Sequence, residues 1–166
     1  MKADRGGWRP MRREQLLQGF IQDSYKAKRK LPEPTRCPTC GAVYRAGRWT
    51  WDKAPAGTNE AMCPACHRIH DHFPGGYLTI SGSFFREHRG EILNRVRNCE
   101  EREKAEHPLE RIMGIEEGED RALVTTTSVH LARLISEALH DSFKGQLDFS
   151  YNREENLLRA TWSRAE

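Results

Sequence analysis

Two short cysteine motifs constrain this chain more than any other feature of its sequence. Each reads Cys-Pro-x-Cys, at residues 37–40 and 63–66, and 22 residues separate them. Two such thiolate pairs complete the closed, four-coordinate tetrahedral shell that is typical of structural zinc. The sequence therefore predicts one structural zinc ion, in a zinc ribbon. Its predicted ligands are Cys37, Cys40, Cys63 and Cys66.

Two other chemistries also use paired cysteines. Disulfides suit small secreted domains, but the N-terminus does not resemble a signal peptide, and a fifth cysteine, Cys99, would be left over. A thioredoxin-like redox site normally places one pair beside a βαβ pattern, and neither pair here has one. Zinc is the preferred interpretation, and disulfide or redox chemistry stays open as the alternative.

Three histidines follow the second cysteine motif, at His67, His70 and His72. A histidine beside such a motif can replace a cysteine ligand or form a second metal site. Because four cysteines already suffice, we expect these side chains to be exposed polar residues. The sequence also contains no glycine-rich phosphate loop, nucleophile elbow or His-Glu-x-x-His motif. We therefore do not expect an enzyme.

The net charge of +3 hides an uneven distribution along the 166 residues. Residues 1–36 carry ten Lys or Arg against four acidic residues, whereas residues 100–120 carry three basic and nine acidic residues. The basic excess lies beside the cysteine motifs, where it suits a polyanion such as RNA. A solvated N-terminal tail is the alternative interpretation.

Aromatic and arginine side chains alternate between the cysteine motifs, at residues 44–51. In a strand, Trp49 and Trp51 would share one face. Bases stack on such rings and guanidinium groups pair with phosphate, although the two tryptophans could equally form the core of a small metal-binding unit. The candidate RNA contacts are Arg9, Arg12, Arg13, Lys26, Lys28, Arg29, Lys30, Arg36, Tyr44, Arg45, Arg48 and Trp49.

Composition limits the size of the apolar core. Hydrophobic residues make up 37% of the chain and charged residues 31%, so a bound metal ion would compensate for a small core. No run of 18 apolar residues is present, so no membrane span is expected. Reduced cysteines without an export signal predict a cytoplasmic protein.

Hydrophobic periodicity divides the chain into four segments. Residues 1–34 form a basic arm with a short helix at about 13–28, and residues 35–80 form the zinc ribbon. Residues 81–107 hold one long connecting helix, and residues 108–166 form an α+β unit. The predicted fold class is therefore α+β, with a zinc ribbon followed by a helix and a small sheet.

The α+β unit is predicted in most detail. Thr127 or Ser128 caps a helix that runs from Val129 to about Phe143, and Gly145 ends it. Alternating apolar residues predict two strands before this helix and two after it. The order ββαββ indicates an antiparallel sheet with one helix packed on one face. A further short strand is expected at residues 77–80, within the ribbon segment.

Four stretches carry a resemblance to known proteins: the cysteine motifs, residues 82–97, residues 107–113 and residues 125–133. They resemble a family of small bacterial zinc-ribbon proteins, over about residues 35–162. More distantly, the paired motifs followed by a helix and a βαβ-like unit are similar to the N-terminal part of the large-subunit nuclear export adaptor of eukaryotes and its archaeal relatives. That resemblance implies zinc binding and an association with the large ribosomal subunit. Only the four cysteines match functional positions of the export adaptor, and this chain has only two of the paired cysteine motifs.

Two functions follow as expectations. The first is a zinc-stabilised RNA-binding protein, associated with the ribosome and contacting rRNA through its basic N-terminal half. The alternative is a zinc-ribbon adaptor that binds a partner protein through the acidic residues 100–120 and the C-terminal unit. Binding that survives nuclease treatment would favour the adaptor.

Overall fold

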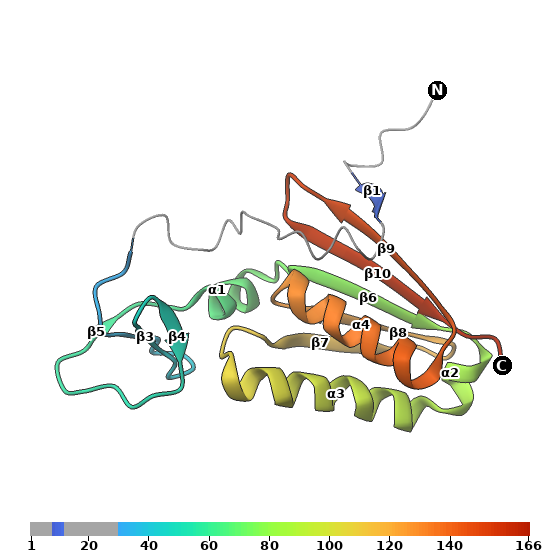
Figure 1. The fold of residues 1–166 in the computed structure, drawn as a ribbon, viewed down its shortest axis with the longest axis horizontal. Coiled ribbons are helices and arrows are strands. Elements are labelled where there is room, and N and C mark those ends of the chain that lie inside the picture. Colours follow the sequence, from blue (N-terminus) through green and yellow to red (C-terminus); the bar gives the residue numbers. More distant parts are fainter. Residues whose placement is uncertain (1–7, 12–29) are drawn as a thin grey trace.

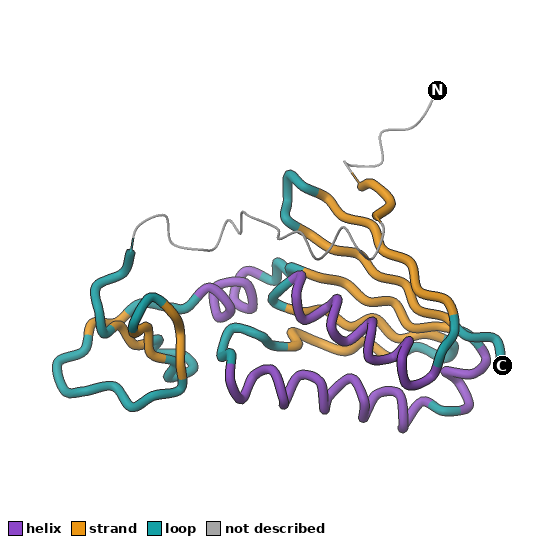
Figure 2. Tube along the Cα trace, viewed as in Figure 1, coloured by secondary structure: helices purple, strands orange, loops and turns teal. Residues whose placement is uncertain are grey.

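The computed structural model describes residues 8–11 and 30–166 and folds them into two mixed sheets and four helices, an α+β arrangement (Figure 1). The helix predicted at about residues 13–28 lies outside the described residues. A small sheet with its loops lies at one end of the molecule, and a larger sheet with its helices forms the rest (Figure 2). Residues 35–71 are here named the cysteine unit, and residues 8–11 and 76–163 the body.

The cysteine unit consists of very short elements. Its sheet has the order β4-β3-β2-β5, and a single helix, α1, follows it. β2 pairs antiparallel with β3 and parallel with β5, so this sheet is mixed. The bounds are β2 Thr35–Arg36, β3 Val43–Arg45, β4 Arg48–Thr50, β5 Asn59–Glu60 and α1 Pro64–Asp71.

The body is built on a six-stranded sheet of order β1-β9-β10-β6-β8-β7. The pair β10–β6 is parallel, and the other four pairs are antiparallel. The bounds are β1 Trp8–Met11, β6 Gly76–Ser81, β7 Ile112–Glu117, β8 Arg121–Thr126, β9 Gln146–Asn152 and β10 Leu157–Ser163. The prediction of a small, purely antiparallel sheet is therefore wrong, because two further strands join the four that were expected.

β6 is the first additional strand, and it lies in the middle of the body sheet rather than with the cysteines. Its side chains alternate between buried and half-buried, and Leu78 and Ile80 are fully buried. Leu78 lies between Ala160 of β10 and Val124 of β8. A strand with one apolar face is stable only where that face is covered, and the helices of the body supply this cover.

β1 is the second additional strand. The sequence places residues 8–11 in the basic arm and predicts no strand there, but they pair with β9, with Pro10 opposite Ser150. Proline cannot donate to a ladder and is therefore tolerated in edge strands. β1 occupies the edge of the sheet, which accommodates it.

Helices α3 (Arg89–Glu106) and α4 (Val129–Phe143) cover one face of the sheet (Figure 1). The bounds of α4 agree with the prediction, and the Ser128 hydroxyl caps it by accepting from Leu131 N at 3.0 Å. The long helix predicted before β7 is instead divided at His88, which leaves the short α2 (Ser83–Glu87). α2 is held at the chain end, where Phe84 N donates to Arg164 O at 3.1 Å.

The core of the body lies between this sheet face and the helices. From the segment predicted as one long helix, the core takes Phe85, Ile92, Val96 and Cys99, which are buried at helical spacing. Trp162 of β10 is the largest fully buried side chain, and its indole Nε1 donates to Lys144 O at 2.6 Å. None of the described helices is long and apolar enough to cross a membrane.

Candidate metal centre

The four predicted cysteine ligands come together in the structure. The sulfurs of Cys37, Cys40, Cys63 and Cys66 all lie within 4.8 Å of one another, and Cys40 is the only one of the four that is not buried. This group could hold a metal ion. In the part of the chain that the structure describes, His67, His70 and His72 do not form a second such group, and all three side chains are exposed.

The first cysteine pair lies in a turn, and the second lies at the start of a helix. The first pair lies between β2 and β3, where Gly41 N donates to Cys37 O at 2.9 Å and Gly41 adopts a φ of 83°. This left-handed conformation favours glycine. The second pair starts helix α1, with Cys63 as its N-cap and Pro64 in its first turn. The positive end of a helix favours thiolate there.

Burial and hydrogen bonding shift the pKa values of three of the cysteine thiols in different directions. Burial acts to raise the pKa of Cys37, but backbone N–H groups, chiefly those of Cys63, Cys40 and Thr39, outweigh it and lower that pKa to about 6. Burial raises the pKa of Cys63 and of Cys66 above the ordinary value. Burial therefore disfavours the thiolate form of Cys63 and Cys66, and a nearby cation favours it.

Arg111 supplies a cation from the body. Its side chain is buried, at 8% exposure, and its Nη1 donates to the sulfur of Cys66 at 3.1 Å. Its Nη2 donates to the sulfurs of Cys40 and Cys63 at 3.0 and 3.4 Å. Burial acts to lower the pKa of Arg111, but the three sulfurs outweigh burial and raise it. The sequence gives no local signal for this residue, because 45 to 71 positions separate it from those cysteines.

The hairpin β3–β4 projects from the cysteine unit. Trp49 packs half-buried against the cysteines, and its ring lies 5.5 Å from that of Tyr44. Arg45 and Arg48 stand opposite each other across the turn and are exposed. Neither has an ion-pair partner within residues 8–11 and 30–166. Trp51 takes a different role from that of a base platform, because its indole Nε1 donates to Lys104 O in the last turn of α3 at 2.6 Å.

The other predicted RNA contacts are spread more widely. Arg36 is exposed and lies 3.8 Å from Glu60, Lys30 is exposed, and Arg9 belongs to β1. The remaining predicted contacts lie outside the described residues: Arg12, Arg13, Lys26, Lys28 and Arg29. The structure thus brings Arg45 and Arg48 together but does not describe the main basic cluster of the arm.

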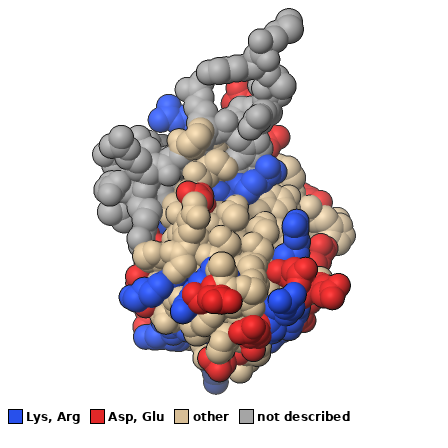
Figure 3. Space-filling model, turned by 90° about the vertical axis from the view of Figure 1, so that its right-hand side faces the viewer, with Lys and Arg blue, Asp and Glu red and all other residues tan. Residues whose placement is uncertain are grey.

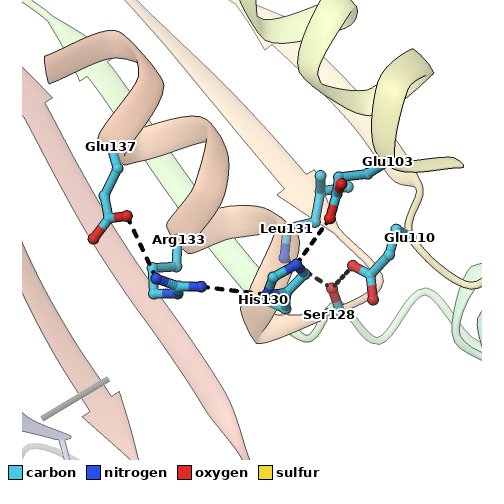
Figure 4. Close-up of polar contacts among 7 residues, drawn as sticks. All are labelled: Glu103, Glu110, Ser128, His130, Leu131, Arg133 and Glu137. Atoms are coloured by element: carbon cyan, nitrogen blue, oxygen red, sulfur yellow. Dashed lines mark hydrogen bonds and ion pairs between the residues drawn. The ribbon is translucent and has the colours of Figure 1, made fainter. Parts of the chain in front are cut away.

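The acidic residues 100–120 are largely engaged within the chain. Figure 4 shows two of these contacts, Glu103 with His130 at 2.9 Å and Glu110 accepting from the Ser128 hydroxyl. A third acid, Glu100, accepts from Ile112 N, and two more pair with arginines of the helices: Arg86–Asp120 at 3.4 Å and Arg89–Glu117 at 3.5 Å. The face of the body shown in Figure 3 accordingly carries charges of both signs interspersed. Two of these acids, Glu100 and Glu103, lie near the C-terminal end of α3, where their contacts offset part of the unfavourable interaction with the helix dipole.

Comparison of the chain with family models, curated proteins and solved structures finds no match. The resemblance to zinc-ribbon proteins therefore stays a prediction. What the site does has to be inferred from its own geometry.

Proposed function

We propose that the protein binds ribosomal RNA through its cysteine unit, and that one zinc ion at the cysteine cluster holds that unit in shape. The four sulfurs and the hairpin support the two parts of this proposal separately. The cluster accounts for the shape of the unit, and the hairpin accounts for its affinity for a polyanion.

Zinc is the ion that best suits four cysteine ligands. Thiolates are soft ligands, and a four-sulfur tetrahedral site is typical of zinc or of iron–sulfur chemistry. All four positions come from the protein, so no site remains open for a substrate. Such an ion would be structural, with Cys37, Cys40, Cys63 and Cys66 as its ligands.

The observation that carries RNA binding is the arginine pair at the hairpin tip. Arg45 and Arg48 are directly opposite in an antiparallel register. Like charges in that position destabilise a hairpin. Neither arginine has an ion-pair partner among the described residues, and the one described carboxylate at the tip, that of Glu33, accepts from Gly47 N at 2.8 Å. Phosphate groups would relieve this repulsion through charge-assisted hydrogen bonds with the two guanidinium groups.

The adaptor alternative has less support. It requires the acidic residues 100–120 to face a partner protein, yet five of the nine acidic side chains there contact other parts of the chain.

The test compares two double variants that remove the same charge. Arg45→Gln/Arg48→Gln changes the hairpin tip, and Arg121→Gln/Arg153→Gln removes two exposed arginines of the body. Binding of labelled single-stranded RNA is followed by fluorescence anisotropy over a salt series, and co-sedimentation with ribosomal particles is measured in parallel. Losing two phosphate contacts should reduce the slope of log affinity against log salt by about 1.4.

The hairpin variant should show this loss while the body variant keeps the wild-type slope. An equal loss in both variants would show that only net charge matters. Equal pelleting with and without ribosomes would remove the ribosomal part of the proposal.

A further inference from the structure

Arg111 connects the two parts of the molecule, because its backbone is bonded to the body and its guanidinium contacts the cysteine unit. The guanidinium contacts sulfurs of both cysteine pairs. Its backbone is fixed to the body, where Arg111 N donates to Thr127 Oγ1 at 3.1 Å and Thr127 N donates to Arg111 O at 2.9 Å. Its Nε donates to Pro108 O at 2.7 Å, which sets the direction of the side chain.

Two weaker contacts join the same parts. Leu109 packs against the cysteines, and its carbonyl accepts from the Thr127 hydroxyl at 2.6 Å. The indole of Trp51 donates to Lys104 O, one of the carbonyls that the end of α3 leaves without a helical partner. The segment from the end of α3 to Arg111 is therefore the junction between the cysteine unit and the body.

The charge of a loaded site explains why an arginine lies there. Four thiolates and one divalent ion leave a net charge of about −2 in a largely buried cluster, and buried charge is costly unless it is paired. The planar fork of a guanidinium can donate to several sulfurs at once, whereas an ammonium group acts as a point charge. Arg111 supplies this neutralising charge from outside the ligand shell.

We propose that Arg111 couples metal binding to the docking of the cysteine unit on the body. Cys40 comes from the first pair, and Cys63 and Cys66 come from the second. The guanidinium reaches all three together only while the two pairs are held to each other, which is what the ion does. Binding free energies are reciprocal, so docking through Arg111 also raises the affinity for the ion.

This inference rests on the zinc site of the proposed function, but it does not require RNA binding. Its consequence is that the hairpin tip is held in a fixed position relative to the body when the ion is bound. Loss of the ion then releases the cysteine unit from the body as well as disordering the cysteine pairs.

The experiment measures zinc transfer from the loaded protein to a coloured chelator, together with hydrogen exchange of residues 48–52 and 100–106. Three variants are compared: Arg111→Gln, Arg111→Lys and Leu109→Ala. Outer-shell partners of metal ligands typically contribute 10- to 100-fold to metal affinity. Arg111→Gln should release zinc faster by about that factor, and the loaded variant should exchange faster in both segments.

The other two variants separate charge from packing. Arg111→Lys keeps the charge but loses the fork, so it should fall between wild type and Arg111→Gln. It also serves as the test variant if Arg111→Gln does not fold. Leu109→Ala removes packing on the cysteines without changing charge, and it should release zinc more slowly than Arg111→Gln.

Three results would overturn the coupling. The first is that both arginine variants release zinc at the wild-type rate and show unchanged hydrogen exchange in the two segments. The second is an equal acceleration in Leu109→Ala, which would assign the effect to packing. The third is a wild-type protein that takes up no zinc, which would also remove the proposed metal site. RNA binding is not measured, so its failure stays distinguishable from all three.

Discussion

The cysteine unit and the body are held together by different forces. Buried residues of the body form one apolar cluster, which includes Trp162, Phe85 and Leu131, and its strands β6 to β10 are six or seven residues long. The buried cluster of the cysteine unit consists of Cys37, Cys63, Ala65 and Cys66, and its strands have two or three residues.

Three of the four buried members of that small cluster are proposed metal ligands. A unit of this size buries too little apolar surface to fold alone, and small domains usually need a metal or disulfides. The body follows the ordinary rule of apolar burial, whereas the cysteine unit is expected to be ordered by a single ion. We therefore expect that each part can be destabilised without unfolding the other.

The largest expected effect is on the cysteine unit. Cys63→Ser removes one ligand and should abolish metal retention, because a structural zinc ion contributes roughly 10–16 kcal/mol of apparent folding free energy. Residues 35–71 should lose amide protection in hydrogen exchange, as should residues 100–106 at the junction, while the rest of residues 76–163 keeps its protection. Cys99→Ser is the matched control, since Cys99 is buried in the body and lies outside the cluster. A metal-free Cys63→Ser protein with an ordered cysteine unit would contradict this account.

A variant of the body should have the opposite outcome, in which the body is destabilised and the cysteine unit keeps its zinc. Trp162→Ala removes the largest fully buried side chain and its hydrogen bond to Lys144 O. Truncations of this kind cost about 3–5 kcal/mol. Urea unfolding of the body should shift by that amount, while zinc content in the absence of urea stays at the wild-type value. Loss of zinc from the native Trp162→Ala protein would show that the two parts are not separable.

A smaller effect is expected at Gly82, between β6 and α2. Gly82 has a φ of 106°, and a Cβ there would lie 2.2 Å from Arg164 O. Gly82→Ala should destabilise the body by about 1–3 kcal/mol, because neither the conformation nor the space suits a side chain. Gly90→Ala is the control, since Gly90 lies in α3 with nothing within 4 Å, and it should stabilise by about 0.5–1 kcal/mol. Thermal unfolding of the two variants should therefore move in opposite directions.

The smallest predicted effect lies at the junction and depends on pH. Burial raises the pKa of Glu110 above its ordinary value, although the Ser128 hydroxyl partly opposes this. A raised pKa in the folded state means that stability is greatest below the unfolded pKa and declines as pH rises through the folded pKa. Glu110→Gln avoids this decline, so it should be more stable than wild type at pH 7, by less than about 1 kcal/mol, and should lose that advantage near pH 4.

Glu101→Gln provides the comparison, because Glu101 is exposed on α3. It should change stability by no more than about 0.5 kcal/mol at either pH. A Glu110→Gln protein that is less stable than wild type at pH 7 would show that the carboxylate itself stabilises the junction.

The sequence predicted what depends on local pattern. The four cysteines cluster as their spacing indicated, and α4 starts and ends where Ser128, Gly145 and the apolar stripe placed it. Cap residues and a 3.6-residue period are local signals. The strand and helix order after residue 108 was predictable for the same reason.

The contacts that were not predicted are long-range. Nothing in residues 76–81 indicates that β6 lies between β10 and β8, because pairing partners are chosen by the whole sheet. The contact of Arg111 with the cysteines and that of Trp51 with Lys104 also join distant parts of the chain. Periodicity reports which face of an element is buried, but it does not report what covers that face.

Native mass spectrometry of the purified protein tests the central claim most directly, because mass reports the metal and the state of the sulfurs together. We predict a single species that carries one zinc ion and no disulfide, and that returns to the mass of the fully reduced chain when zinc is removed. A metal-free protein lighter than the fully reduced chain by two hydrogens for each cysteine pair would show disulfides instead. That result would contradict the metal-ordered cysteine unit and the role assigned to Arg111.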